Sequence, residues 1–280
     1  YQLPSGIVLS ADAMEPTVVT STVAARNVSA RGDGSFVVEM EELFTGWFEV
    51  ANLAGAPGST VTFNVSTMEG TVEEYNMANA YTFGASGAGN FRMRFSYNEI
   101  QYITINGLSK PPALADVVGK RLAVDLRRTG HFESSSSLVN KEYAITVNNY
   151  LGLTTGGMTV DCPHRERRGY GGDGHTSYQF ALAHFAVGAY FTKWARDFAD
   201  VQTADGNVPH TAPTVSGGGG PAWSGFVITL PYEVHRAHGD TRLLAQMYPT
   251  MQRLLAFFAN HTDATDNLLH PWTTSKWDFL

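Results

Sequence analysis

The sequence predicts a chain of two parts, an antiparallel β-sandwich followed by a set of long helices. Up to about residue 130, apolar residues recur at every second position in short runs separated by Gly, Pro and Asn, which is the pattern of antiparallel strands. After about residue 135 they recur three or four positions apart, as in amphipathic helices. We therefore expect a β domain over residues 1–130 and a helical domain over residues 131–280.

Five runs in the first part are predicted to be strands. In the run 91–95, apolar and basic residues alternate strictly, so one face would lie in the core and the other in solvent. Turn signals such as Gly32-Asp33-Gly34 and Asn106-Gly107 separate the runs. The predicted strands are Ser35–Met40, Trp47–Ala51, Val61–Val65, Phe91–Phe95 and Tyr102–Ile105.

Four segments in the second part have helical periodicity. One of them contains Pro231, which predicts a kink or a restart at that residue. Long helices joined by loops that contain Pro, Gly and His suggest helical hairpins stacked into a toroid or a bundle. The run Ser216–Gly220 is expected to be a loop between two helices. The predicted helices are Ser137–Val147, Thr176–Val201, Phe226–Ala237 and Thr241–Asn260.

The composition excludes several classes of function. The formal net charge is −7 and only 16% of the residues are charged, so no basic surface for nucleic acid is expected. No apolar run approaches the roughly 20 residues of a membrane span. The single cysteine, Cys162, excludes an internal disulfide. Aromatic residues make up 12% of the chain, many of them beside Gly, Asn and Asp, a mixture that carbohydrate sites favour.

The densest chemistry of the chain lies in the segment Asp161–Asp173, which reads DCPHRERRGYGGD. It holds three carboxylates, three arginines, a histidine and a tyrosine, together with Pro163 and three glycines. Proline restrains the backbone and glycine lets it turn sharply, so such a loop can aim side chains into a cleft. The segment is therefore predicted to be an active-site loop.

Three kinds of role fit these residues. The first is general acid catalysis of glycoside cleavage, in which a carboxylic acid stays protonated near neutral pH. Glu166 stands between Arg165 and Arg167, which lower its pKa, so its protonation would depend on Asp161 or Asp173 nearby. The second is metal binding, although the spacing matches no familiar motif. The third is a salt-bridged loop that packs two helices together. The metal ligands would be Asp161, His164, Glu166, Asp173 and His175.

Three further side chains have two interpretations each. Trp223 follows the glycine run and offers a flat face to a sugar, although a core tryptophan would fit the same pattern. His210 lies in a loop beside a helix, where it either lines the cleft or is only partly exposed. Cys162 is interpreted as a small packing residue rather than a nucleophile, because no partner base is identifiable.

The segment Asp161–Asp173 resembles the signature loop of the α-L-rhamnosidases of glycoside hydrolase family 78. Upstream, Phe44–Trp47 and Gln101–Gly107 look like the family's β-sandwich segment that precedes its catalytic barrel. Many members have one more residue between the arginine and the glycine of the loop than this chain has. The other matching segments, in the family's order, are Lys193–Asp197, Asp205–His210, Gly220–Trp223, Tyr232–Asp240, Tyr248–Met251 and Lys276–Leu280.

The resemblance implies an inverting exo-hydrolase, without cofactor or metal, that removes terminal α-L-rhamnose from glycosides or polysaccharides. The implied fold is an antiparallel β-sandwich followed by an incomplete (α/α)6 barrel. By the same resemblance, Glu166 matches the general acid, while Asp161 and Arg165 match residues that hold the rhamnose hydroxyls. Tyr170 stands where many members have tryptophan. The implied catalytic residues are Glu166, Asp161 and Asp173, and the implied substrate-binding residues are Arg165, Tyr170 and Trp223. His210 is added to the candidate substrate-binding residues from its position in the loop beside a helix.

Inversion also needs a second carboxylate, about 6.5–9.5 Å from the acid, to activate water. In the family this base lies well over two hundred residues beyond the signature, whereas 107 residues (280 − 173) follow Asp173 here. We therefore expect the base to lie outside this chain and the chain alone to have negligible activity. Two alternatives stay open: a glycosidase of another terminal sugar on the same barrel, and a noncatalytic carbohydrate-binding protein. The sequence indicates neither the compartment nor the oligomeric state.

Overall fold

The computed structural model describes residues 6–7, 11–71 and 78–272, and the chain divides into two compact units. The first, which we call the sheet unit, comprises Thr17–Asp125 and Phe132–Gly174. The second, the helical unit, comprises Tyr1–Pro16, Leu126–His131 and His175–Leu280. The division into domains 1–130 and 131–280 stays a prediction, and the segment Lys276–Leu280 lies outside the described residues.

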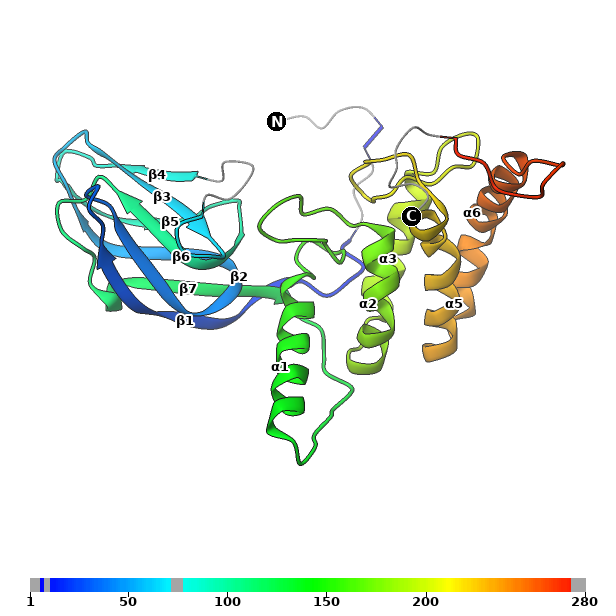
Figure 1. The fold of residues 1–280 in the computed structure, drawn as a ribbon, viewed down its shortest axis with the longest axis horizontal. Helices are drawn as coiled ribbons and strands as arrows, with labels where there is room; N and C mark the ends of the chain where they lie inside the picture. The colour runs from blue at the N-terminus through cyan, green and yellow to red at the C-terminus, as the bar shows by residue number, and fades with distance from the viewer. Residues whose placement is uncertain (1–5, 8–10, 72–77, 273–280) are drawn as a thin grey trace. The chain divides into compact units, whose positions relative to one another are not determined.

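The strands of the sheet unit form one antiparallel sheet that curls back on itself (Figure 1). Within the described residues its order is β1-β7-β2-β6-β3-β4, with β5 paired to β2 and β1 also paired to β2. The expectation of antiparallel β structure is therefore confirmed, in a sandwich-like form. The elements are β1 (Thr17–Ala30), β2 (Phe36–Ala54), β3 (Thr60–Ser66), β4 (Ala78–Thr82), β5 (Ala88–Arg92), β6 (Asn98–Asn106), the 3-10 helix η1 (Leu114–Asp116) and β7 (Val117–Val124).

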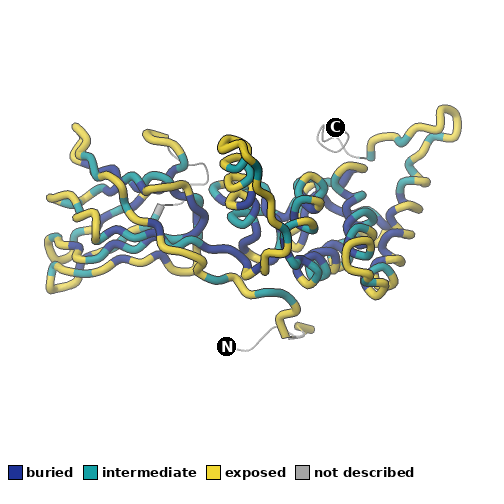
Figure 2. Tube along the Cα trace, turned by 90° about the horizontal axis from the view of Figure 1, so that it is seen from below, coloured by how far each residue is buried: buried dark blue, intermediate teal, exposed yellow. Residues whose placement is uncertain are grey.

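Strand β2 organises the core of the sheet unit because it pairs with four other strands. Its register against β6 shifts between Glu39 and Phe44, as at a β-bulge. Both halves pair with β6, while residues 36–40 also pair with β1 and residues 46–50 with β7. Phe48 of β2 packs against the rings of Phe63 and Phe91, at centroid distances of 5.6 and 5.4 Å. Each fully buried side chain of this size contributes about 2 kcal/mol. Figure 2 shows the resulting alternation of buried and exposed positions along the strands.

The predicted strand Phe91–Phe95 is wrong in its second half, since β5 ends at Arg92. The backbone leaves the extended region at Phe95, where φ is 58°. The alternation of side chains continues in the sequence, but the backbone needed for pairing does not. Phe95 lies in the connection that leads to β6.

Six helices follow the sheet in the described residues. Ser136 caps α1 by accepting a hydrogen bond from the Val139 amide, and Asp240 caps α6 in the same way from Arg242 and Leu243. The helices predicted over 137–147, 226–237 and 241–260 are confirmed within a few residues, and Pro231 lies inside a continuous α5. The helices are α1 (Ser137–Gly152), α2 (Gly171–His184), α3 (Gly188–Asp200), α4 (Pro221–Ser224), α5 (Phe226–His238) and α6 (Thr241–Asn260).

The single helix predicted over Thr176–Val201 is wrong, because α2 and α3 are separate helices. The helical conformation is interrupted at residues 185–187, where the amide of Ala186 donates to the carbonyl of Arg127 at 2.9 Å. Phe185 forms an isolated β-bridge with Arg128 in the same segment. This pairing with a distant part of the helical unit replaces the helical hydrogen bonds, and local periodicity cannot reveal it.

The core of the helical unit lies among α3, α5 and α6, which pack side by side (Figure 1). Trp194 of α3 is fully buried, with its ring centroid 4.7 Å from that of Phe226 on α5. Its indole N–H donates to the carbonyl of Ala212 at 3.3 Å, so the buried polar atom is satisfied. Among the described residues, none of these helices has the length and hydropathy to cross a membrane.

Candidate active site

We call the segment Asp161–Asp173 the signature loop. Its first part is closed by hydrogen bonds within the sheet unit. The amide of Asp161 donates to the carbonyl of Arg168, and the amide of Arg168 donates to Oδ1 of Asp161, each at 3.1 Å. Between them Arg167 has a φ of 54°, an uncommon conformation for a residue with a long side chain. This closure holds Asp161 and Glu166 next to each other.

Glu166 shares a hydrogen bond with Asp161. That bond, followed by burial and by the negative charge of Asp161, raises the pKa of Glu166 above its ordinary value. The Tyr170 hydroxyl and the Arg165 guanidinium act in the opposite direction and do not outweigh these effects. The side chain is 29% exposed, so it can still reach solvent or a ligand. Glu166 is the group of the pair that holds a proton most readily.

Asp161 has the opposite tendency. Burial alone would raise its pKa, but hydrogen bonds from Glu166, from the thiol of Cys162 and from backbone amides lower it. The thiol donates to Oδ2 of Asp161 at 2.9 Å. Burial, followed by this contact with Asp161, raises the pKa of Cys162 to about 12. Cys162 therefore stays protonated and serves as a donor to Asp161 rather than as a nucleophile.

The three remaining sequence-predicted residues of the loop surround this pair. The Tyr170 hydroxyl is hydrogen-bonded to Glu166, and burial followed by the charge of Glu166 raises the pKa of Tyr170 to about 12. Nη2 of Arg165 lies 4.0 Å from Oε1 of Glu166. Asp173, in the first turn of α2, has a pKa raised by burial and by the charge of Asp161. The five predicted residues of this loop thus form one electrostatically connected group.

A second set of residues, not predicted from the sequence, braces the loop from the sheet. Nη1 of Arg167 donates to the carbonyl of Tyr97 at 2.7 Å, and its guanidinium lies 4.9 Å from the centre of the Tyr97 ring. Nδ1 of His164 lies 2.9 Å from Oε2 of Glu99 on β6. Two charged side chains of the loop therefore have a structural role. Neither contact involves an acid of the loop, so these acids are available for catalysis.

The alternative of a metal site receives little support from this donor set. Asp161, Cys162 and Glu166 each offer an atom within 4.8 Å of the others. A cation there would have to displace the proton of the thiol and that of Glu166. Of the two histidines considered as ligands, His164 is occupied by Glu99. His175 uses both ring nitrogens, on the carbonyl of Ala222 and the hydroxyl of Thr229, each at 2.6 Å.

The other two predicted residues, His210 and Trp223, lie together in the helical unit. Their ring centroids are 5.1 Å apart. His210 is buried, and its Nε2 lies 3.0 Å from the carbonyl oxygen of Gly219. Trp223 is half-buried in α4, directly after the glycine run. The structure thus brings five predicted residues together in one unit and two in the other, and a single pocket shared by all seven stays a prediction.

The glycine run is a fitted loop, with little room at two of its positions. A Cβ atom on Gly217, where φ is 72°, would lie 2.0 Å from Nδ1 of His210. One on Gly219, where φ is 81°, would lie 2.2 Å from the carbonyl oxygen of Val208. Both the backbone conformation and the close approach therefore require glycine. The run positions His210 and the start of α4.

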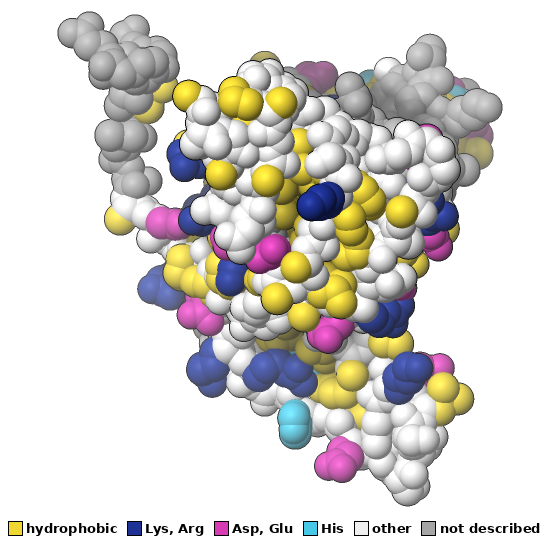
Figure 3. All heavy atoms as spheres, turned by 90° about the vertical axis from the view of Figure 1, so that its left-hand side faces the viewer, with side chains coloured by type: hydrophobic (Ala, Val, Ile, Leu, Met, Phe, Trp, Pro, Cys, Tyr) yellow, Lys and Arg dark blue, Asp and Glu magenta, His cyan; other side chains and the backbone are white. Residues whose placement is uncertain are grey.

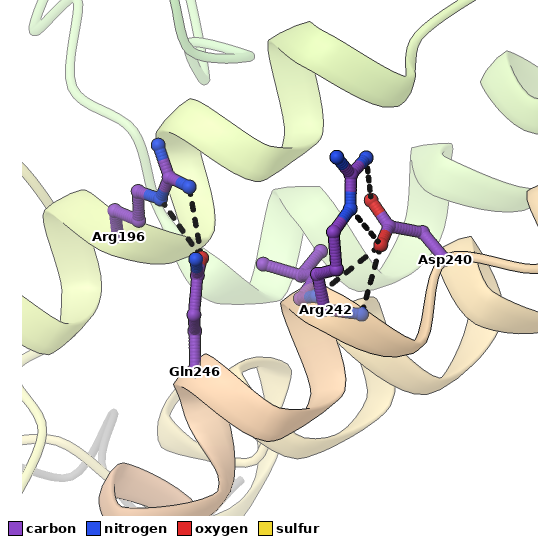
Figure 4. Close-up of polar contacts among 5 residues, drawn as sticks. Arg196, Asp240, Arg242 and Gln246 are labelled. Atoms are coloured by element: carbon purple, nitrogen blue, oxygen red, sulfur yellow. Dashed lines mark hydrogen bonds and ion pairs between the residues drawn. The ribbon is translucent and has the colours of Figure 1, made fainter.

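A further polar cluster in the helical unit borders a cavity of about 440 Å³ (Figure 4). Nη2 of Arg196 on α3 donates to Oε1 of Gln246 on α6 at 2.8 Å. Nε of Arg242 lies 3.2 Å from Oδ1 of Asp240, the residue that caps α6. Both arginines already have partners, so the cluster joins α3 to α6 and caps the N-terminus of α6. It is not a second candidate site.

Comparison with known proteins places the chain in a family. Residues 127–280 match the family described as bacterial alpha-L-rhamnosidase 6 hairpin glycosidase domain. An alpha-L-rhamnosidase of Streptomyces avermitilis is 27% identical over 284 residues, which cover 96% of this chain and 26% of that protein. One from Formosa agariphila is 25% identical, covering 90% of this chain and 29% of that protein. The chain therefore spans between a quarter and a third of the length of these relatives.

Solved structures show the same similarity in three dimensions. The Streptomyces avermitilis alpha-L-rhamnosidase complexed with L-rhamnose matches with a TM-score of 0.82 and 25% identity, covering 90% of this chain and 26% of that one. The fold is also shared with native alfa-L-rhamnosidase from Aspergillus terreus, with a TM-score of 0.75, 22% identity and coverage of 85% and 29%. On the match of residues 127–280, this chain belongs to the family of bacterial α-L-rhamnosidase six-hairpin glycosidase domains.

Proposed function

We propose that this chain carries the acid half of an inverting α-L-rhamnosidase site. Its helices would form the first part of an (α/α)6 barrel, and the general base would come from sequence beyond this chain. The observation that carries the proposal is the hydrogen bond between Glu166 and Asp161, which raises the pKa of one carboxyl and lowers that of the other. Two carboxyls held at different pKa values are typical of glycosidases that need one acid and one anion.

In the proposed reaction, Glu166 donates its proton to the glycosidic oxygen as the bond from that oxygen to C1 of the rhamnose breaks. Water attacks C1 from the opposite face, and the base takes a proton from that water. The products are rhamnose with inverted configuration at C1 and the free alcohol of the aglycone. In this scheme the proton of Glu166 must turn from Asp161 toward the substrate.

The neighbouring residues are suited to bring about that turn. Anionic Asp161 can accept hydrogen bonds from rhamnose hydroxyls, and a hydroxyl that occupies Asp161 frees the proton of Glu166 for the leaving oxygen. Tyr170, which stays protonated, keeps its hydrogen bond to Glu166 and fixes the carboxyl. Arg165, 4.0 Å from Glu166, would hold a second hydroxyl. Substrate-binding roles are proposed for Trp223 and His210 as well, whose ring centroids lie 5.1 Å apart in the helical unit.

The test is the substitution Glu166→Gln in the complete protein. We expect kcat/KM on an alkyl α-L-rhamnoside, a substrate with a poor leaving group, to fall by about 10²–10⁴-fold. On a rhamnoside with an activated phenol as leaving group the loss should be much smaller, because little protonation is needed. Glu142→Gln, on an exposed position of α1, makes the same substitution elsewhere and should change neither rate.

The same variant separates the proposal from its alternatives. If Glu166→Gln keeps the wild-type rate on both rhamnosides, Glu166 is not the acid. If neither protein hydrolyses any rhamnoside but both bind rhamnose, the site is a noncatalytic carbohydrate site. A preference for another terminal sugar over rhamnose by more than about tenfold in kcat/KM would assign the barrel to that sugar.

A further inference from the structure

Each of the two paired carboxyls, Asp161 and Glu166, is bound by a neutral donor of its own. The thiol of Cys162 donates to Oδ2 of Asp161 at 2.9 Å. The hydroxyl of Tyr170 is hydrogen-bonded to Glu166. Both donors belong to the signature loop and hence to the sheet unit. The proposed reaction gives the thiol no part, although it contacts one of the two carboxyls.

Neither donor titrates near neutral pH. Burial is the largest of the causes that raise the pKa of Cys162, and likewise that of Tyr170, to about 12. A group that keeps its proton in this way donates its hydrogen bond at acidic and neutral pH alike. Such a bond favours the charged form of the carboxyl that accepts it. Cys162 therefore favours the anion of Asp161, and Tyr170 favours the anion of Glu166.

The thiol of Cys162 is fixed against Asp161 by two further contacts. Its sulfur accepts a hydrogen bond from the backbone amide of Glu166. The carbonyl of Cys162 accepts a hydrogen bond from the amide of Arg165 at 3.3 Å. Pro163, the next residue, restrains the backbone. The sulfur thus joins the backbone of Glu166 to the side chain of Asp161, a role that needs both a donor and an acceptor.

Tyr170 is anchored on both sides of its backbone, directly before α2 begins. Its amide donates to the carbonyl of Arg168 at 3.1 Å, and its carbonyl accepts from the amide of Gly174 at 3.0 Å. The amide of Arg168 in turn donates to Oδ1 of Asp161 at 3.1 Å. The backbone of Arg168 therefore ties the position of Tyr170 to that of Asp161.

Charges around the two carboxyls act on them less selectively than these donors do. A charge acts on both carboxyls, because they lie next to each other, whereas a hydrogen bond acts on the one that accepts it. Figure 3 shows acidic and basic side chains interspersed on the visible face of the sheet unit, so that face adds no strong field of one sign. The charged and titratable groups around the two carboxyls and their donors are Arg165, Arg167 and Arg168 of the loop, Asp173 of α2, and Tyr97 of the connection between β5 and β6.

We propose that Cys162 and Tyr170 are two positioning residues that set the pH range of the enzyme from opposite ends. Cys162 keeps Asp161 in the anionic form that holds a rhamnose hydroxyl, and so sets the acidic limit of substrate binding. Tyr170 stabilises the anion that Glu166 becomes after it has donated its proton, and so sets the alkaline limit of proton donation. The inference rests on the proposed function, because it assigns these limits to two groups of that reaction.

The first test removes the thiol from the complete enzyme by Cys162→Ala. Without that donor the anion of Asp161 is less stable, so its pKa rises and Asp161 takes up a proton at a higher pH than in the wild type. L-Rhamnose binding, measured by titration calorimetry over a range of pH, should therefore weaken at a pH about 0.5–1 unit higher. At pH 7, where Asp161 stays charged in both proteins, the affinities should agree within about threefold.

The second test removes the hydroxyl and keeps the ring by Tyr170→Phe. The anion of Glu166 then loses a donor, so the pKa of Glu166 rises and the acid keeps its proton to a higher pH. The alkaline limb of kcat/KM on an alkyl α-L-rhamnoside should move up by about 0.5–1 pH unit. At the optimum, kcat should fall by about threefold to tenfold, because Glu166 is then a weaker acid. The pH dependence of rhamnose binding should stay that of the wild type.

Three control variants separate hydrogen bonding from packing. Cys162→Ser keeps a donor and an acceptor at the same position and should bind rhamnose with the pH dependence of the wild type. Cys162→Val fills the space without a donor and should behave as Cys162→Ala does. It also supplies a second variant without the donor where the alanine variant fails to fold. Tyr143→Phe removes a hydroxyl from α1 of the same unit and should move neither limit.

Three outcomes would overturn the inference. In the first, Cys162→Val matches the wild type and Cys162→Ser matches Cys162→Ala, so that the side chain only packs. In the second, Tyr170→Phe leaves the alkaline limb in place. In the third, both substitutions move the same limit, so that the donors do not act on separate carboxyls. Glu166→Gln separates these failures from that of the proposed function, because its loss on alkyl rhamnosides requires neither donor.

Discussion

Two loops of this protein carry all of the predicted site residues except Trp223, and they are held in different ways. The signature loop of the sheet unit is closed around charged groups, with Asp161 and Glu166 joined by a hydrogen bond and Arg167 fixed on Tyr97. The loop Asn207–Gly220 of the helical unit, which we call the glycine loop, presents His210 through neutral backbone contacts and close packing at glycine. One loop depends on protonation and charge, and the other on steric fit.

The difference predicts how each loop fails. Steric fit has no adjustable component, so an added methyl group must move its neighbours and costs free energy at every pH. A network of charges responds to pH and to the exact donor geometry, while its partly exposed members are screened by solvent. Substitutions in the glycine loop should therefore have the larger effects on stability, and those in the signature loop the more specific ones.

The largest effect on stability is expected for Gly217→Ala. The new Cβ would lie 2.0 Å from Nδ1 of His210 and the φ of 72° would add strain, so the free energy of unfolding should fall by about 3 kcal/mol. Urea denaturation, monitored by tryptophan fluorescence, measures this free energy of unfolding, because Trp194 and Trp223 lie in the helical unit. Gly239→Ala is the matched control, with a φ of 70° and no atom within 4 Å of the added Cβ.

The control separates backbone strain from steric overlap. Gly239→Ala should cost only about 1 kcal/mol, the strain of a left-handed alanine. Equal losses for the two variants would show that the imidazole of His210 moves aside freely. The glycine loop would then not be the fitted element of the comparison.

A smaller effect is expected for Arg167→Lys in the signature loop. Lysine keeps the charge but loses the planar contact with the Tyr97 ring and the geometry of the bond to its carbonyl. We expect a loss of about 2 kcal/mol in the free energy of unfolding of the sheet unit. Arg236→Lys, in an exposed ion pair with Glu233, is the control and should cost less than about 0.5 kcal/mol. Losses of the same size for both would mean that Arg167 does not brace the loop.

The sequence predicts the elements whose pattern is local. Alternation marks the strands around Phe48 and Phe63, and the helical period marks α5 and α6, because each of these faces a core. Strand β1 has no such pattern, because most of its residues are exposed and it owes its conformation to pairing with β7 and β2. The break between α2 and α3 is hidden for a similar reason, since residues 127–128 cause it.

The candidate site likewise contains residues that the sequence predicts and residues that it does not. The density of acids and arginines in one short segment suffices to single out Asp161 and Glu166, whose hydrogen bond is a local contact. Tyr97 and Glu99 could not be found, because they precede the loop residues that they contact by 65–70 positions. No periodicity or motif connects two segments so far apart. The nearest signal is the polar and aromatic run 96–99, just before a predicted strand.

The smallest effect on stability concerns the shared proton itself, and it can be measured without any substrate. The pKa of Glu166 is raised above its ordinary value of 4.5 in the folded protein. The stability that it contributes is therefore fully present below pH 4.5 and is lost as the pH rises through its folded pKa. Asp161, with a pKa lowered from 3.8, contributes stability above that pH and loses it as the pH falls.

In Glu166→Gln an amide N–H can donate to Asp161 at every pH. The variant therefore does not lose stability as the pH rises through the folded pKa of Glu166. The free energy of unfolding of the wild type should therefore fall relative to that of Glu166→Gln between pH 4.5 and pH 7, by less than about 1 kcal/mol because the loop is partly exposed. Glu142→Gln, measured over the same range, corrects for the change in net charge. A difference that stays constant with pH would mean that the two carboxyls share no proton. The signature loop would then be held, like the glycine loop, by fit alone.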